Sequence, residues 1–156
     1  MYTLNIQSTP TNQVDSGLSI VPKIPLPSSN LAGITLTKGV YTIPTLAGTI
    51  SAGGILTIDG GGNSANQIIV IFNTTFTVGA GAIIKLINGA VACNVYFLAG
   101  TSITLNANAI TVGNFIAQTS ITVANAVQNS GTLCAINGAT TLINDALIAQ
   151  CGTCPT

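Results

Sequence analysis

Short segments in which hydrophobic and polar residues alternate recur along most of the chain. The unit is an apolar residue, a threonine and a second apolar residue, as in Ile103-Thr104-Leu105 and Ile121-Thr122-Val123. Such alternation is typical of a β-strand with one buried face, because successive side chains point to opposite sides. We expect the apolar residues to point inward and the threonines to form an exposed ladder on one face. The ladder threonines are Thr35, Thr57, Thr77, Thr104, Thr122 and Thr141.

The spacing of these threonines indicates a repeat of about twenty residues, and this period is the signature of a solenoid. Two more apolar segments accompany the threonine unit, as in Ala109-Ile110 and Phe115-Ile116. Glycine, asparagine and alanine separate the segments and leave no room for helices of useful length. We therefore predict an all-β, three-sided solenoid, in which each coil pairs its backbone with the next about 4.8 Å away.

The chain divides into three parts. Residues 32–150 carry the repeat, with an inserted loop predicted at 86–94. Residues 1–31 contain two strand-like pieces, "YTLNIQST" and "LSIVPKI", among several prolines, which fit an extended arm better than a central strand. Residues 151–156, "CGTCPT", form a cysteine-containing tail.

Composition removes several classes of function. The 156 residues are 47% hydrophobic but include only three lysines and three aspartates, with no arginine, glutamate, histidine or tryptophan. The zero net charge favours association over dispersal. Lys23, Lys38 and Lys85 are not clustered as nucleic-acid binding requires. No apolar run is long enough to span a membrane, because glycine, threonine or asparagine interrupts each one.

The residue types also argue against an enzyme. The carboxylates are Asp15, Asp59 and Asp145, and Asp59 lies in the glycine-rich turn "DGGGN". We expect Asp59 and Asp145 to stabilise turns by accepting backbone hydrogen bonds. Without histidine, no serine or cysteine has the usual general base beside it.

The chain has four cysteines: Cys93, Cys134, Cys151 and Cys154. Without histidine, a zinc site would need all four as ligands, so we predict no metal site. A disulfide, within or between chains, is favoured for the exposed tail pair Cys151 and Cys154. Cys134 falls in an apolar column and is expected to be a small buried apolar residue.

Several longer stretches carry a resemblance to a known family. They are "LTKGVYTI" at 36–43, "LTIDGGGN" at 56–63, "LINGAVACNVYF" at 86–97, "ITVGNFIAQTSITV" at 110–123 and "LCAINGATTL" at 133–142. Through them the chain from about Leu31 to Gln150 resembles the ice-binding-like β-solenoid family, which comprises microbial ice-binding and antifreeze proteins and their adhesin relatives. The resemblance implies a right-handed triangular β-helix without catalytic residues or cofactors, and a structural role for Cys93.

The chain departs from this family at its N-terminus. The usual N-terminal segment supplies an opening coil and a long helix along the solenoid, and here the arm of residues 1–31 stands in its place. We therefore expect one solenoid edge to be uncovered. The start of the chain does not read as a signal peptide. A location outside the cell or on its surface is expected, by an export route that the sequence does not identify.

Three functions are compatible with these features. The favoured hypothesis is a non-enzymatic structural protein whose arm adds strands to the open edge of a neighbouring subunit, giving a head-to-tail filament or coat. The docking residues would be Ile6, Leu18, Ile20 and Val21. The alternative is an antifreeze protein that binds ice through the threonine ladder, although threonine also suits any exposed strand. An adhesin-type surface-binding module is the third.

Overall fold

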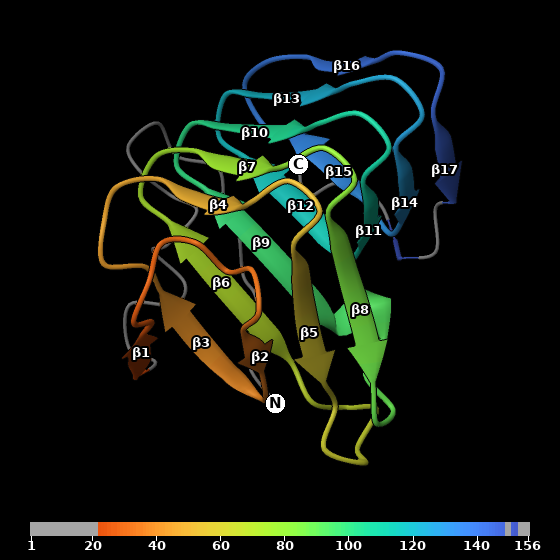
Figure 1. The fold of residues 1–156 in the computed structure, drawn as a ribbon. Helices are drawn as coiled ribbons and strands as arrows, with labels where there is room; N and C mark the ends of the chain where they lie inside the picture. Colours follow the sequence, from red (N-terminus) through yellow and green to blue (C-terminus); the bar gives the residue numbers. More distant parts are fainter. Residues whose placement is uncertain (1–21, 149–150, 153–156) are drawn as a thin grey trace.

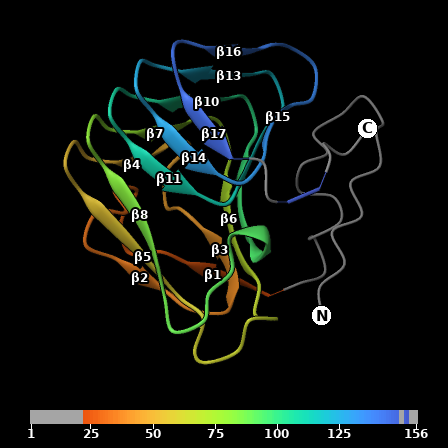
Figure 2. The same cartoon turned by 90° about the vertical axis from the view of Figure 1, so that its right-hand side faces the viewer.

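The computed structural model describes residues 22–148 and 151–152, which form a solenoid of three parallel β-sheets (Figure 1). The chain passes through the sheets in a fixed order. The first coil adds a strand to sheets A and C only, and each later pass adds a strand to every sheet, beside the strand added one coil earlier (Figure 2). The described part of the chain contains no α-helix. The prediction of an all-β solenoid is confirmed.

The sheets are termed A, B and C. Sheet A contains β1 (Lys23–Pro25), β3 (Gly39–Thr42), β6 (Ile68–Phe72), β9 (Val95–Ala99), β12 (Asn114–Ala117) and β15 (Leu133–Ala135). Sheet B contains β4 (Gly48–Ile50), β7 (Phe76–Val78), β10 (Ser102–Leu105), β13 (Ser120–Val123) and β16 (Thr140–Leu142). Sheet C contains β2 (Thr35–Leu36), β5 (Ile55–Asp59), β8 (Ile83–Ile87), β11 (Ile110–Val112), β14 (Gln128–Ser130) and β17 (Ala146–Ile148). A 3-10 helix, η2 (Ala92–Asn94), lies in the inserted loop.

The core runs along the axis between the three sheets, and stacked phenylalanines occupy much of it. The rings of Phe72 and Phe76 lie 4.2 Å apart, and those of Phe97 and Phe115 lie 4.9 Å apart. Phe76 also stacks on Phe97 at 5.4 Å. The stack joins sheet A to the inner side of sheet B, so the strands of both sheets rest on one rigid aromatic column.

The N-terminal end of the solenoid is covered by this chain itself. Lys23–Pro25, assigned above to the arm, form β1 and pair in parallel with β3. The backbone N–H of Leu26 donates to the Thr42 carbonyl, and that of Leu31 to the Thr49 carbonyl, at 2.8 Å in both cases. Both leucines are buried.

The expectation that residues 1–31 form an arm that docks on a neighbouring subunit is therefore wrong for residues 22–31. These residues pair with, and pack on, a coil of their own chain. The predicted docking residues lie outside the described residues: Ile6, Leu18, Ile20 and Val21.

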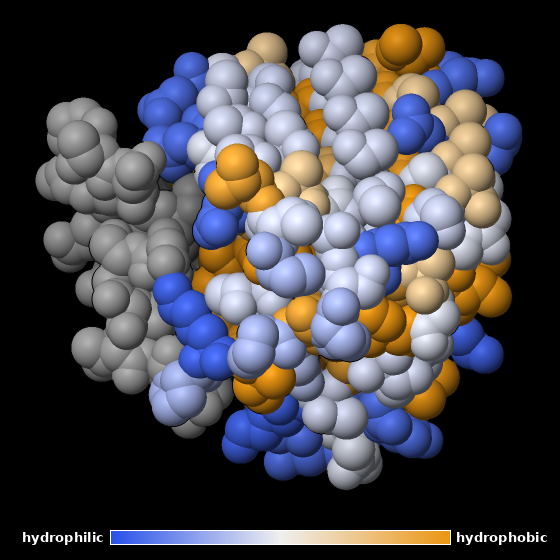
Figure 3. Space-filling model, turned by 60° about the vertical axis from the view of Figure 1, so that its left-hand side comes forward, coloured by the Kyte–Doolittle hydropathy of each residue, from blue (hydrophilic) through white to orange (hydrophobic). Residues whose placement is uncertain are grey.

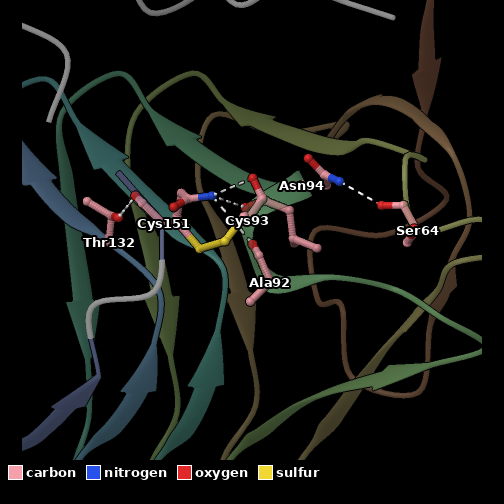
Figure 4. The surroundings of a disulfide bond; sticks show 8 residues. Ser64, Ala92, Cys93, Asn94, Thr132 and Cys151 are labelled. Atoms are coloured by element: carbon pink, nitrogen blue, oxygen red, sulfur yellow. Dashed lines mark hydrogen bonds between the residues drawn. A yellow bond between two sulfur atoms is a disulfide. The ribbon is translucent and has the colours of Figure 1, made fainter. Parts of the chain in front are cut away.

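The cysteine pairing also differs from the prediction. Cys151 is bonded to Cys93, with their Cα atoms 5.0 Å apart, and not to Cys154 (Figure 4). Cys134 is buried as expected but is disulfide-bonded, so it is not a free apolar thiol. Cys154 lies outside the described residues. Because sulfurs in disulfides are not thiolate ligands, the four-cysteine zinc alternative is wrong as well.

Hydrogen bonds hold both ends of this disulfide. The buried side-chain amide nitrogen of Asn114 lies 3.1 Å from the Val95 carbonyl oxygen and 3.2 Å from that of Cys93. On the other side, the Thr132 hydroxyl donates to the Cys151 carbonyl (Figure 4). The disulfide therefore ties the tail to a loop that is already fixed to the solenoid.

Replacing both Cys93 and Cys151 by serine should lower the free energy of unfolding by about 2–4 kcal/mol, because the link spans 58 residues and restricts the unfolded chain. Urea denaturation of the parent and the double variant under non-reducing conditions measures the loss. The Cys134 disulfide is left intact in this comparison. Equal stability of the two proteins would show that the link contributes nothing.

Residue 48 on β4 must be a glycine, because the Phe72 ring leaves no room there for a side chain. It lies opposite Phe76 on the next coil, and an added Cβ would clash with the Phe72 ring. Its φ is not among the positive values, so the requirement is steric and not conformational. Gly48 thus allows the Phe72–Phe76 pair to lie directly under sheet B.

Gly48→Ala should lower the free energy of unfolding by about 1–3 kcal/mol through overpacking against Phe72. Urea denaturation measures this, and Phe72→Leu serves as the partner change. If the clash is the cause, Gly48→Ala should cost less in a Phe72→Leu background than in the parent. An equal cost in both backgrounds would exclude the proposed contact.

Candidate functional site

The outer surface of sheet B carries one threonine on each of its five strands. The residue pairing places these threonines in a single row, termed the sheet-B ladder: Thr49, Thr77, Thr104, Thr122 and Thr141. Their side chains are partly or fully exposed, whereas the residues on either side of Thr77, Thr104 and Thr49 are buried. Neighbouring threonines are therefore about 4.8 Å apart along the solenoid.

The predicted ladder is thus corrected in two respects. Thr35 and Thr57 pair with each other in sheet C, on a different face from the other four predicted threonines. Thr49 belongs to the ladder but was missed, because Gly48 replaces the first apolar residue of its unit. All three sheets use the same alternation, so the pattern identifies outward positions without assigning them to a sheet. The signal in the sequence that identifies Thr49 is its spacing of 28 residues from Thr77.

A second row of hydroxyl groups accompanies the ladder at its central coils. Ser102 and Ser120 are paired in register two residues before the ladder threonines of β10 and β13, and their hydroxyl oxygens lie 3.0 Å apart. Thr75 occupies the corresponding position just before β7. At the ends of the sheet, Ala47 and Ala139 replace the hydroxyl-bearing residue. The face is therefore two rows wide over three coils and one row wide at both ends.

No charged side chain lies on a strand of sheet B. The charged residues in the described part of the chain are Lys23 on β1, Lys38 between β2 and β3, Asp59 on β5, Lys85 on β8 and Asp145 between β16 and β17. Figure 3 shows rows of pale, weakly polar residues running along the upper part of this side of the molecule. The sheet-B face is thus a regular array of methyl and hydroxyl groups without charge.

Both described carboxylates stabilise turns, which confirms the prediction for these two residues. Asp59 accepts hydrogen bonds from the backbone N–H of Gly61 at 2.8 Å and from the side-chain amide of Asn88 at 3.1 Å. Asp145 accepts from the backbone N–H groups of Val127 at 3.0 Å and Ile143 at 2.9 Å. The carboxylate oxygens of both residues are therefore engaged in hydrogen bonds that stabilise the turns. Asp15 lies outside the described residues.

The other two sheets present different surfaces. On sheet C, Thr57 lies opposite Lys85, which interrupts the row that Thr35 begins. Next to that row, the side chains of Ile55 and Ile110 are exposed. Most outward side chains of sheet A are apolar and buried, in a cluster separate from the central core: Val40, Ile69, Ile71, Leu98, Ile116 and Cys134. Lys23 and Asn114 occupy further outward positions of this sheet. Among the described residues, sheet B alone offers solvent an uninterrupted row of hydroxyl-bearing side chains.

Within residues 22–148 and 151–152, metal-ligating side chains do not gather in groups of three or more. None of the helices in this part of the chain has the length and hydrophobicity needed to span a membrane.

Comparison with known proteins gives consistent results for sequence and structure. A family model described as Ice-binding-like matches residues 10–148. An ice-binding protein of Nostoc sp. (strain HG1) is 35% identical over 138 residues, which cover 88% of this chain and 50% of that protein. The chain therefore spans about half the length of this relative.

Two solved structures share the fold. A domain of Shewanella frigidimarina ice-binding protein 1 superposes with a TM-score of 0.75 and 31% identity, over 85% of this chain and 55% of that one. An ice-binding protein from an Antarctic Flavobacteriaceae bacterium gives a TM-score of 0.78 at 29% identity, over 92% of this chain and 32% of that one.

These comparisons overturn the favoured functional hypothesis. The relatives and solved structures reported above are ice-binding proteins, and their descriptions do not mention a filament. The prediction of a filament built by strand donation is therefore wrong, whereas the predicted family resemblance is confirmed. With a family model matching 10–148 and a solenoid that superposes on its solved members, the chain belongs to the ice-binding-like family.

Proposed function

We propose that this protein binds ice through the outer face of sheet B. The observation that carries the proposal is the sheet-B ladder, in which a threonine occupies the same outward position on every strand of the sheet. The face forms a grid with spacings of about 4.8 Å along the solenoid and about 6.6 Å between alternate residues of a strand. Threonine hydroxyls can hydrogen-bond to water at these spacings, while the methyl groups confine the water between them.

Rigidity supports the same function. A surface can order water only if its groups keep their positions, since every group that must be immobilised on binding costs entropy. The backbone of sheet B is paired on both sides over its three central strands. Beneath β7, Phe76 packs within the aromatic stack. The hydroxyl of Thr49 also donates to the Thr77 carbonyl at 3.1 Å, which fixes its rotamer.

The absence of charge on sheet B strands has a separate effect. Lysine and carboxylate groups bind water strongly in arrangements that do not match a lattice, and stripping that water is costly. Lys85 places such a group at the centre of sheet C, whereas the strands of sheet B carry none. The outer face of sheet B is therefore better suited to binding ice than the outer face of sheet C.

The cysteines support the predicted location. Disulfides persist in oxidising surroundings, so Cys93–Cys151 and the bonded Cys134 favour a protein that works outside the cell or on its surface. We also infer the right-handed winding that the family implies, because connections between parallel strands are almost always right-handed. Ice binding needs no catalytic residue, which fits the use of Asp59 and Asp145 in turns.

Thr104→Tyr should abolish most of the protein's thermal hysteresis, because a bulky ring would stand above the ladder where it is two rows wide. Thr57→Tyr is the matched control, with the same substitution on an outward position of sheet C. Thr49→Tyr, where the face is one row wide, should have a smaller effect. Thermal hysteresis and ice-crystal shaping are measured for each, with circular dichroism and thermal melting to establish that the fold is intact.

Two results would refute the assignment. A parent protein that shapes ice no more than buffer does would exclude ice binding. A Thr57→Tyr variant as impaired as Thr104→Tyr would place the site on a face other than sheet B.

A further inference from the structure

Asparagine is followed directly by glycine at two places in the described part of the chain, Asn88–Gly89 and Asn137–Gly138. Asparagine is a thermally labile residue, because its side-chain amide can be lost as ammonia. The loss is fastest before glycine, since glycine has no side chain to hinder the approach of its backbone nitrogen to the asparagine side chain. All four residues are exposed, so exposure does not distinguish the two pairs. Their hydrogen bonds do.

The side chain of Asn88 is held by a neighbouring turn. Its amide nitrogen donates to the Asp59 carboxylate at 3.1 Å. Its backbone lies in the left-handed region, with a φ of 49°, and its carbonyl accepts from the Gly62 N–H at 2.9 Å. The Asn88 side chain must leave Asp59 before its Cγ can approach the Gly89 nitrogen. The fold therefore protects this pair.

The side chain of Asn137 is not held in this way. Asn137 lies in the corner between β15 and β16 (Figure 1). Its backbone N–H donates to the Gln118 carbonyl at 3.1 Å, which fixes the main chain of the corner. Within residues 22–148 and 151–152, its side-chain amide has no hydrogen-bond partner. The side chain is therefore free to turn toward the nitrogen of Gly138.

We propose that Asn137 is a site of spontaneous deamidation, with water as the only co-reactant. The backbone nitrogen of Gly138 bonds to Cγ of Asn137, and the Cγ–Nδ2 bond breaks. Nδ2 leaves with the bonding electron pair and takes the proton that the Gly138 nitrogen loses, so ammonia is released and a cyclic succinimide remains. Water then opens the ring. Cleavage between Cγ and the Gly138 nitrogen gives aspartate, and cleavage at the main-chain carbonyl carbon gives isoaspartate.

The isoaspartate product does not fit this corner. Its main chain runs through Cβ and Cγ and is therefore longer by one atom. The corner already passes close to the preceding coil, since an added Cβ on Gly138 would clash with the Thr119 carbonyl oxygen. Two residues after Gly138, Thr140 begins β16 in register with Ile121. The extra atom therefore weakens the pairing of β16 with β13.

Both products also place a carboxylate beside sheet B, and this consequence alone rests on the proposed ice binding. Residue 137 is followed closely by Ala139, at the end of the second row, and by Thr141, the last threonine of the sheet-B ladder. The carboxylates of Asp59 and Asp145 are engaged in turns. Deamidation therefore brings an unengaged charge to the edge of an uncharged face, and ice binding declines as the protein ages.

Peptide mapping by mass spectrometry tests the site in the full chain with its disulfides intact. The protein is incubated at mildly alkaline pH, which helps the Gly138 nitrogen to lose its proton. The Asn137 peptide should convert to aspartate and isoaspartate several-fold faster than the Asn88 peptide. In guanidinium chloride, where neither side chain is held, the two should convert at similar rates, and incubation continues until they have done so. Asn137→Gln should remove the products at position 137 and leave those at Asn88 unchanged.

An Asn137 that stays intact in the folded protein, after the unfolded control has converted, would overturn the proposal. Equal rates at Asn88 and Asn137 in the folded protein would overturn the protection assigned to Asp59.

The consequence for ice is measured separately, with Asn137→Asp as a mimic of the aspartate product. Asn63→Asp is the matched control, because Asn63 is exposed in the loop between β5 and β6 and an aspartate can still accept from the Ala65 N–H. Thermal hysteresis should fall for Asn137→Asp and persist for Asn63→Asp. Equal hysteresis in the two would overturn the effect on the face. The mapping involves no ice, so a parent that lacks ice binding leaves the deamidation result interpretable.

Discussion

The structure depends on the in-register pairing of each coil with the next. In sheet B the pairing joins Thr49 to Thr77, Thr77 to Thr104 and Thr104 to Thr122 without a shift of one residue. A shift of one residue would send every outward side chain into the core and every core side chain to the surface. The regular row of hydroxyls and the continuous hydrophobic interior are therefore two results of one constraint. Register is held by burial on the inner side, where Phe76, Ile103 and Ile121 align.

Three outer faces arise from this single backbone arrangement. The inner positions of all three sheets are occupied mostly by apolar residues, whereas the outward positions differ. They are mostly apolar and buried on sheet A, threonine-rich on sheet B, and mixed and interrupted by Lys85 on sheet C. Since the outward threonines of sheet B are partly or fully exposed and contribute little to the core, they can be changed without loss of the fold. The candidate function is therefore located in the outward side chains of one sheet, and the other two sheets complete the core beneath it.

Much of the fold could be predicted from the sequence, because alternation and repeat length report directly on strand type and coil size. The candidate site could be predicted only in part. Four of the six predicted threonines lie on sheet B, but Thr35 and Thr57 do not, since the same apolar-threonine-apolar unit also occurs on strands of sheet C. Thr49 escaped notice because a glycine was needed beneath it for the phenylalanine stack. The Cys93–Cys151 pair was missed because stacking, and not sequence proximity, brings the two sulfurs together.

That disulfide changes how the solenoid can come apart. Coils that contact only their neighbours can peel away one at a time from a free end, each with its own small stability. Here Cys151, after the last strand, is bonded to Cys93, which precedes β9. The coils between these two points are enclosed in one covalent loop, so the last of them cannot separate alone. The C-terminal part of the solenoid is thereby favoured to open as a single cooperative unit. β16, at the C-terminal end of the candidate surface, then opens together with β10 and β13 and not before them.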